Sequence, residues 1–198
     1  MSRPALAAQL SEAGIEIAPD SPDYQQSIEA LFNQGFGPGR FAKTAERLRE
    51  GNVERYDLSR VALKNGILVA AGKVWPIDIG GAPALFFGPF AVDLNERHHG
   101  LGRIIIDSCV DAAIAAGDSV MLLVGAADYF APSGFEVAPR GLLSLPGPVD
   151  PARLLWRELR PGGLDGISGA VTLPRAARPC LKPAGRGRAH SSISRSSG

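Results

Sequence analysis

The apolar pattern of residues 101–116 constrains the fold more than any other part of the sequence. One face of this predicted helix is apolar and carries Leu101, Ile104, Ile105, Cys109, Ala112 and Ala116. Gly117 ends the helix, and the continuous apolar run at 119–124 has the length of a buried strand. Because a strand pattern also precedes the helix, at 84–92, the order strand, helix, strand predicts a parallel crossover.

The segments before this unit predict an antiparallel meander. The predicted strands are residues 14–18, 58–63, 67–77 and 84–92, of which the last three form the meander. Asn65-Gly66 favours a tight hairpin turn between the second and third of these strands, and Gly80-Gly81 turns the chain again. Two helices are predicted upstream of the meander, from Asp23 to near Gly35 and over the more charged residues 41–49.

The chain after residue 126 predicts several short elements. They are a helical or looped piece reaching Ser133, a strand starting at 134–137, a small helix at 152–159 and a final strand at 169–173. The whole order predicts an α+β fold, with a mixed and mostly antiparallel central sheet and helices on both faces.

Composition restricts the class of protein. A chain of 198 residues with 45% hydrophobic and 21% charged residues is long enough for one well-filled core. No apolar stretch approaches the roughly 20 residues that a bilayer requires, and the N-terminus lacks a signal-peptide pattern. We therefore expect a cytoplasmic protein without a membrane partner. Cys109 and Cys180 lack Cys-x-x-Cys spacing, which predicts neither a disulfide nor a thiolate metal site.

The positive charge is concentrated at the C-terminal end. Residues 175–198 carry six Lys and Arg side chains and no acid, so the net charge of +1 leaves −5 for residues 1–174. This acidic balance disfavours nucleic-acid binding by the body of the chain. The Arg, Ser, Gly and Pro content predicts a folded domain over 1–174 and a basic, disordered tail over 175–198. A tail that contacts nucleic acid or an acidic partner is the alternative interpretation.

The turn between strand 86–92 and the long helix has the features of a phosphate site. Amides at the start of a helix lack internal partners and carry the positive end of the helix dipole. Gly100 and Gly102 would let an anion approach the backbone closely. The alternative is that both glycines only permit a tight turn. Ile105 replaces the third glycine of a dinucleotide fingerprint, and no Gly-Lys-Ser/Thr triplet of a P-loop occurs.

These residues resemble a known family. Arg97-x-x-Gly100-x-Gly102, placed after Ala91-Val92-Asp93, is similar to the Gln/Arg-x-x-Gly-x-Gly/Ala signature of the GNAT superfamily. Further segments resemble a bacterial subgroup of predicted N-acetyltransferases, namely Leu122 to Gly125, Asp128-Tyr129-Phe130, Gly134-Phe135 and the Leu-Pro-Gly-Pro-Val-Asp-Pro run at 145–151. The resemblance covers about residues 14–174.

The resemblance implies an acyltransferase that moves an acetyl group from acetyl-CoA to an amine of a small molecule or protein. It places the CoA diphosphate on the glycine loop and the pantetheine arm in a wedge where strand 86–92, which carries a bulge, parts from strand 120–124. The implied cofactor-binding residues are Phe90, Ala91, Val92, Arg97, His98, His99, Gly100, Leu101, Gly102 and Arg103. No metal is implied, and a homodimer stays open.

The sequence departs from the family pattern at the position of the catalytic acid. Many relatives have a tyrosine four residues before the Gly-Phe pair, whereas this chain has Phe130 there and Tyr129 one residue earlier. Tyr129 is therefore the candidate acid, and a tyrosine that only packs its ring is the alternative. A CoA thiolate can also leave unassisted, since thiol pKa values lie only about 1.5 units above neutrality.

The base and the acceptor are not identified by the sequence. Glu96, Asp78 and Asp128 are candidate bases only because they are carboxylates near the expected cleft. Trp75, Phe86, Phe87 and Phe90 are expected in the core rather than in a substrate cage. Two alternative functions remain at this level: an inactive acyl-CoA sensor, which Phe130 motivates, and an interaction module that acts through the basic tail.

Overall fold

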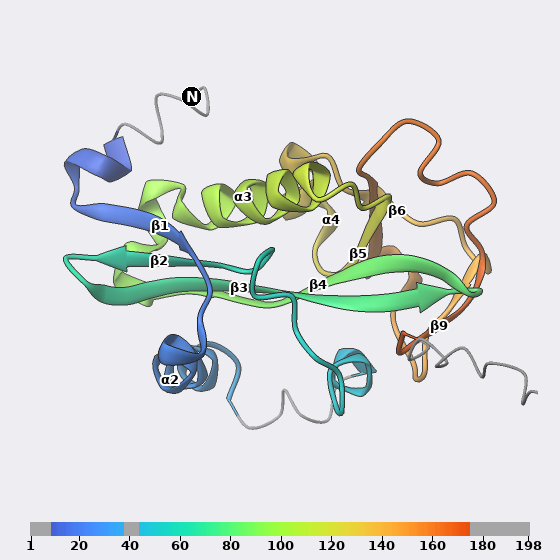
Figure 1. Cartoon of the computed structure of the whole chain (residues 1–198), viewed down its shortest axis with the longest axis horizontal. Coiled ribbons are helices and arrows are strands. Elements are labelled where there is room, and N and C mark those ends of the chain that lie inside the picture. Colours follow the sequence, from blue (N-terminus) through green and yellow to red (C-terminus); the bar gives the residue numbers. More distant parts are fainter. Residues whose placement is uncertain (1–8, 38–43, 175–198) are drawn as a thin grey trace, which may run out of the picture.

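A single mixed sheet organises the molecule. The computed structural model describes residues 9–37 and 44–174, whose strands form a nine-stranded sheet (Figure 1). Its antiparallel part contains β1 (Ile15–Pro19), β2 (Arg60–Lys64), β3 (Ile67–Ile79) and β4 (Ala82–Val92). The predicted meander is confirmed, and both turn residues Asn65 and Gly66 have positive φ, as an Asn-Gly hairpin turn requires.

The predicted crossover is confirmed as well. Helix α3 (Leu101–Ala115) follows β4 after the 3₁₀ helix η4 (Leu94–His99) and leads into β5 (Val120–Val124). β5 pairs in parallel with β4. The fold class predicted from the sequence, α+β with a mostly antiparallel mixed sheet, is therefore the observed one.

The two faces of the sheet are covered by different helices (Figure 1). On one face, the buried side of α3 packs against a cluster that includes Val74, Leu85, Phe87 and Leu123. On the other face, α2 (Gln25–Phe36) packs through Ile28, Leu31 and Phe32 on Val61, Ala71 and Ala91. Residues alternate between the faces because successive strand side chains point to opposite sides.

Short helices complete the N-terminal half and the region after β5. They are η1 (Pro22–Tyr24), η3 (Thr44–Leu48), α4 (Ala127–Phe130), η5 (Ala131–Ser133) and η6 (Pro151–Arg153). The helix predicted over 41–49 is thus only a 3₁₀ turn where the structure describes it. None of the described helices is long and apolar enough to cross a membrane.

The prediction of a small helix over 152–159 is wrong. After η6 the chain enters β8 (Leu154–Glu158), which pairs antiparallel with β5 along its whole length. Leu154, Leu155 and Trp156 are all buried. A strand covered on both faces is a continuous apolar run, and periodicity alone does not separate such a run from a helix.

Three short strands close the structure. β6 (Glu136–Val137) pairs with β8, and β7 (Leu143–Ser144) pairs in parallel with β9 (Gly169–Thr172). β9 also pairs with β3 at Asp78 and Ile79. The predicted final strand is confirmed, and β7 has too few residues to be recognised from its sequence. The tail 175–198 and Cys180 lie outside the described residues.

Candidate active site

The sheet opens between β4 and β5. Among the described residues these strands pair only at Leu85 with Met121 and Phe86 with Leu122. Beyond Phe86, towards the C-terminal ends of both strands, the pairing stops. The register between β3 and β4 also shifts, because Gly72 faces Phe90 while Val74 faces Phe87. β4 therefore contains one extra residue, a bulge, at the point where the opening begins.

The bulged end of β4 directs part of its backbone into the opening. The amide of Asp93 donates to Val69 O of β3 at 2.8 Å. Since successive residues of a strand point their amides to opposite edges, the NH and C=O groups of Val92 and Phe90 face away from β3. Arg97 Nε contacts Val92 O on this outer side at 3.4 Å. The outer edge is where an extended ligand could pair with β4 as an added strand.

The N-terminus of α3 lies at the same end of β4. Its N-cap residue, Gly100, has φ of 68° and supplies no side-chain cap, while Gly100 O accepts from the amides of Arg103 and Ile104. The amides of Leu101 and Gly102 are the first two of the helix and have no acceptor within it. The backbone thus presents donors and a positive dipole end, the combination that binds an anion.

Position 102 has no room for a side chain. A Cβ there would lie 2.3 Å from the Tyr129 hydroxyl and 3.1 Å from Phe90 Cζ. The glycine therefore permits the close approach of α4 to the start of α3. The position of the Tyr129 side chain therefore determines whether the space beside Gly102, at the start of α3, is filled.

The two predicted arginines differ in their surroundings. Arg97 is exposed beside the opening. Arg103 donates to Pro132 O at 2.8 Å and lies 3.5 Å from Asp107, so it joins α3 to η5. Of the predicted cofactor residues, Phe90 to Val92, Arg97 and Gly100 to Gly102 lie along the opening or at the helix start. His98 and His99 belong to η4, and the structure does not describe their side chains.

A row of aromatic rings crosses the opening from β4 to α4. Phe87 lies 5.9 Å from Phe90 and 6.4 Å from Phe130, and the ring of Tyr129 lies 6.3 Å from that of Phe90. Phe130 is buried and also packs on Phe135. Tyr129, 52% exposed, extends instead towards Gly102 at the mouth. Burial raises the pKa of Tyr129, and the nearby charge of Arg97 opposes this shift.

The three carboxylates considered as bases do not gather at the opening. Glu96 forms an ion pair with Lys64 at 2.7 Å, and Asp78 lies at the far end of β3 beside β9. Asp128 is exposed on α4. Within the described residues, no three His, Cys, Asp or Glu side chains are grouped to hold a metal ion.

Sequence reasoning missed a buried charged cluster at the bulge. Lys73 on β3 contacts Asp20 and Glu54 at 2.8 and 2.7 Å, although the three residues lie far apart in the chain. A lysine inside an apolar strand pattern, between Gly72 and Val74, was the one available signal for this cluster. Buried charges require partners, so Lys73 alone predicts an acidic neighbour but not which one.

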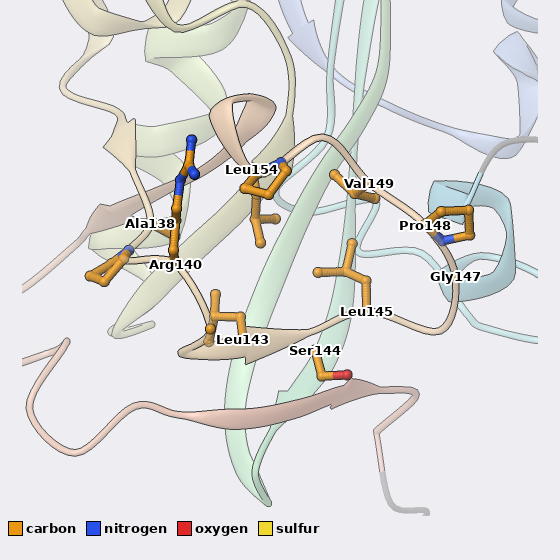
Figure 2. A pocket seen from close by; sticks show the side chains of 12 residues that line it. Ala138, Arg140, Leu143, Ser144, Leu145, Gly147, Pro148, Val149 and Leu154 are labelled. Atoms are coloured by element: carbon orange, nitrogen blue, oxygen red, sulfur yellow. The ribbon is translucent and has the colours of Figure 1, made fainter.

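A cavity of about 280 Å³ lies on the face of the sheet opposite α3 (Figure 2). Leu143, Leu145, Val149 and Leu154 surround it, and Arg140 extends along one edge. Thr44 Oγ1 donates to Pro148 O at 2.6 Å and ties the outer wall to η3. Leu154 pairs with Val124 at the end of β5, which links the cavity to the strand that parts from β4.

Comparison with known proteins agrees with this geometry. No protein-family model matches the sequence. The chain is 27% identical over 160 residues to the uncharacterised N-acetyltransferase YhbS of Escherichia coli K12, across 79% of this chain and 92% of that one. The crystal structure of YhbS, a GNAT family N-acetyltransferase in complex with CoA, superposes with a TM-score of 0.70 at 25% identity and covers 80% and 89% of the two chains. The chain is thus similar in sequence and in fold to a GNAT family N-acetyltransferase.

Other solved GNAT structures share the fold. An acetyltransferase of Brucella melitensis in complex with acetyl-CoA superposes with a TM-score of 0.58 at 21% identity, covering 81% of this chain and 96% of that one. N-acetylglutamate synthase of Neisseria gonorrhoeae, complexed with CoA and N-acetyl-glutamate, gives 0.52 at 16% identity over 74% and 35% of the two chains. At these identities the likeness concerns the fold alone.

Proposed function

We propose that this protein is a GNAT-type acetyltransferase, which transfers an acetyl group from acetyl-CoA to a primary amine by direct attack of the amine on the thioester. The observation that supports this most is the opening between β4 and β5, with pairing limited to two residue pairs and an uncapped helix start at its mouth. An acyl-CoA molecule has the matching shape, with a diphosphate at one end and an extended amide-bearing arm.

Each part of the opening receives a role in this proposal. The amides of Leu101 and Gly102 bind the diphosphate, and Arg97 adds positive charge. Val92 and Phe90 pair with the amides of the pantetheine arm, and a free amide at the bulge polarises the thioester carbonyl as negative charge develops there. His98 and His99 of η4 and Arg103 of α3 complete the proposed cofactor-binding residues. Residues 1–174 form the acyltransferase domain, and 175–198 form the separate tail.

The acceptor amine approaches from the face of the sheet opposite α3. The cavity beside Val124 and η3 lies on that face, so a bound amine would meet the thioester across the thickness of the sheet. Its apolar wall favours an acceptor with an apolar body. Both a small molecule and the side chain of a protein fit this description.

Isothermal titration calorimetry with acetyl-CoA tests the cofactor site, and Gly102→Ala is the decisive variant. A methyl group at this position collides with the Tyr129 hydroxyl and the Phe90 ring and displaces them at the mouth of the opening, so we expect affinity to fall about tenfold or more, equivalent to roughly 1.4 kcal/mol. Gly35→Ala is the matched control, because it adds the same methyl group to a helical glycine with an ordinary contact of 3.6 Å. Equal affinities for both variants, or a dissociation constant weaker than about 1 mM for the wild type, would refute the site.

The second candidate function is an acyl-CoA-binding protein without transferase activity. Phe130 supports it, since the buried ring lies beside Phe87 and offers no proton at the base of the opening. Thiol release from acetyl-CoA in the presence of primary amines separates the two functions. Turnover that depends on the amine eliminates the binding-only function.

A further inference from the structure

The cluster around Lys73 contains more negative than positive charge. Lys73 Nζ lies 2.8 Å from Asp20 Oδ2 and 2.7 Å from Glu54 Oε2, and Gln25 Oε1 accepts from it at 2.9 Å. The ring of Tyr56 lies 5.6 Å from the same ammonium. One cation therefore serves two carboxylates, although Asp20 alone would balance its charge.

Glu54 is the surplus member of the cluster. Asp20 Oδ1 accepts from the amide of Ser21 at the start of η1, and Asp20 Oδ2 has its ion pair with Lys73 but no further hydrogen bond. Glu54 Oε1 has no hydrogen-bond partner within residues 9–37 and 44–174. The Glu54 side chain is only 6% exposed. A buried carboxylate oxygen without a donor is costly, so the arrangement is poorly explained by stability alone.

The position of the cluster relates it to the proposed reaction. Lys73 lies between Gly72 and Val74, which face Phe90 and Phe87, so its backbone is opposite the β4 bulge, at a strand spacing of about 5 Å. Its side chain points to the face opposite α3, since Val74 packs with α3 and Gln25 belongs to α2. The amide of Arg55 bonds to Val74 O at 2.9 Å, which fixes Glu54 over this part of β3.

We propose that Glu54 is the group that accepts the proton of the acceptor's ammonium, with Lys73 and Asp20 as its positioning residues. This assignment rests on the proposed acetyl transfer. The cluster lies on the proposed acceptor face, and Lys73 is on the strand next to the bulge that would polarise the thioester. Burial raises the pKa of Glu54 to about 7, while Lys73 lowers it and Asp20 raises it, so the carboxylate can take up and return a proton near neutral pH.

The proton balance of the reaction is complete with this group. The ammonium gives one proton to the Glu54 carboxylate, and the neutral amine attacks the carbonyl carbon of the thioester. A carbon–nitrogen bond forms, the carbon–sulfur bond breaks, and the second amine proton goes to the departing CoA thiolate. The products are the amide, CoA thiol and neutral Glu54, which then loses its proton to solvent.

The test is the pH profile of Glu54→Gln in the full-length protein, with acetyl-CoA and the best acceptor from a panel of aliphatic, aromatic and aminoacyl primary amines. For the wild type we expect log kcat/KM to rise with unit slope up to about pH 7 because Glu54 must be ionised. The variant should lose this break and about 100-fold or more in kcat/KM. The ionisation of the amine itself affects both proteins equally.

Controls separate this inference from the proposed function. Glu50→Gln removes an exposed glutamate of the same segment and should keep both the rate and the profile. Calorimetry should give the same acetyl-CoA affinity for Glu54→Gln as for the wild type. An active wild type whose break near pH 7 survives in Glu54→Gln overturns the role of Glu54 alone. No turnover by the wild type with any amine of the panel refutes acetyl transfer, and this inference with it.

Discussion

Tyr129 and Phe130 are neighbours in the sequence but have different surroundings in the structure. The Tyr129 hydroxyl lies 2.3 Å from the place that a Cβ of Gly102 would take, at the start of α3, whereas Phe130 is buried beside Phe87. The sequence predicted Tyr129 as the acid because it is the nearest aromatic hydroxyl. The observed position favours a hydrogen bond to the cofactor near its diphosphate, with the raised pKa keeping the hydroxyl protonated as a donor.

Tyr129→Phe distinguishes these roles. A hydrogen bond to a charged group contributes about 1.5–3 kcal/mol, so we expect KM for acetyl-CoA to rise about tenfold while kcat changes little. Acetyl-pantetheine, which lacks the diphosphate, should react equally with both proteins. A large fall in kcat with either donor would instead identify Tyr129 as the acid.

Elements with a long repeated pattern were predictable, and elements defined by their partners were not. The stripe of α3 and the Asn65-Gly66 turn contain their own structural signal, and both were predicted correctly. β8 was mistaken for a helix because its apolar residues are explained only by β5 beside it and the layers above and below. The position of Glu54 over Lys73 likewise depends on a contact between distant segments, which no local pattern contains.

The ion cluster joins β3, α2 and the segment before β2, and its titration should be visible in stability. The pKa of Glu54 is raised from 4.5 to about 7 in the folded protein, chiefly by burial. Between these pH values the folded state binds more protons than the unfolded state, so this group lowers stability as pH rises from about 4.5 to 7. Glu54→Gln lacks this term, and its free energy of unfolding relative to wild type should therefore increase over that interval.

Urea unfolding of both proteins at several pH values between 4.5 and 8 measures the difference. Glu50→Gln, in the same segment but exposed, should run parallel to the wild type. A constant difference between Glu54→Gln and the wild type would mean that Glu54 titrates normally in the fold.

At the scale of the whole molecule, the sheet ends before the basic tail begins. β9 closes the fold by pairing with β3 and β7, and its last residue is Thr172. The boundary at residue 174 between the acidic body of the chain and its basic tail is visible in the sequence. It thus lies just after the last described strand. We expect a protein truncated after residue 174 to keep the thermal midpoint and acetyl-CoA affinity of the full chain. A drop in either quantity would place part of the tail within the domain.

The burial of Cys109 has a practical consequence. Its side chain is fully enclosed between α3 and β3, and burial raises the pKa of its thiol to about 12. A thiolate is the species that reacts with disulfide reagents, so Cys109 does not react with them in the native protein. Truncation also removes Cys180, the only other cysteine of the chain. The shortened enzyme would then allow colorimetric detection of liberated CoA in real time, free of any signal from its own sulfur atoms.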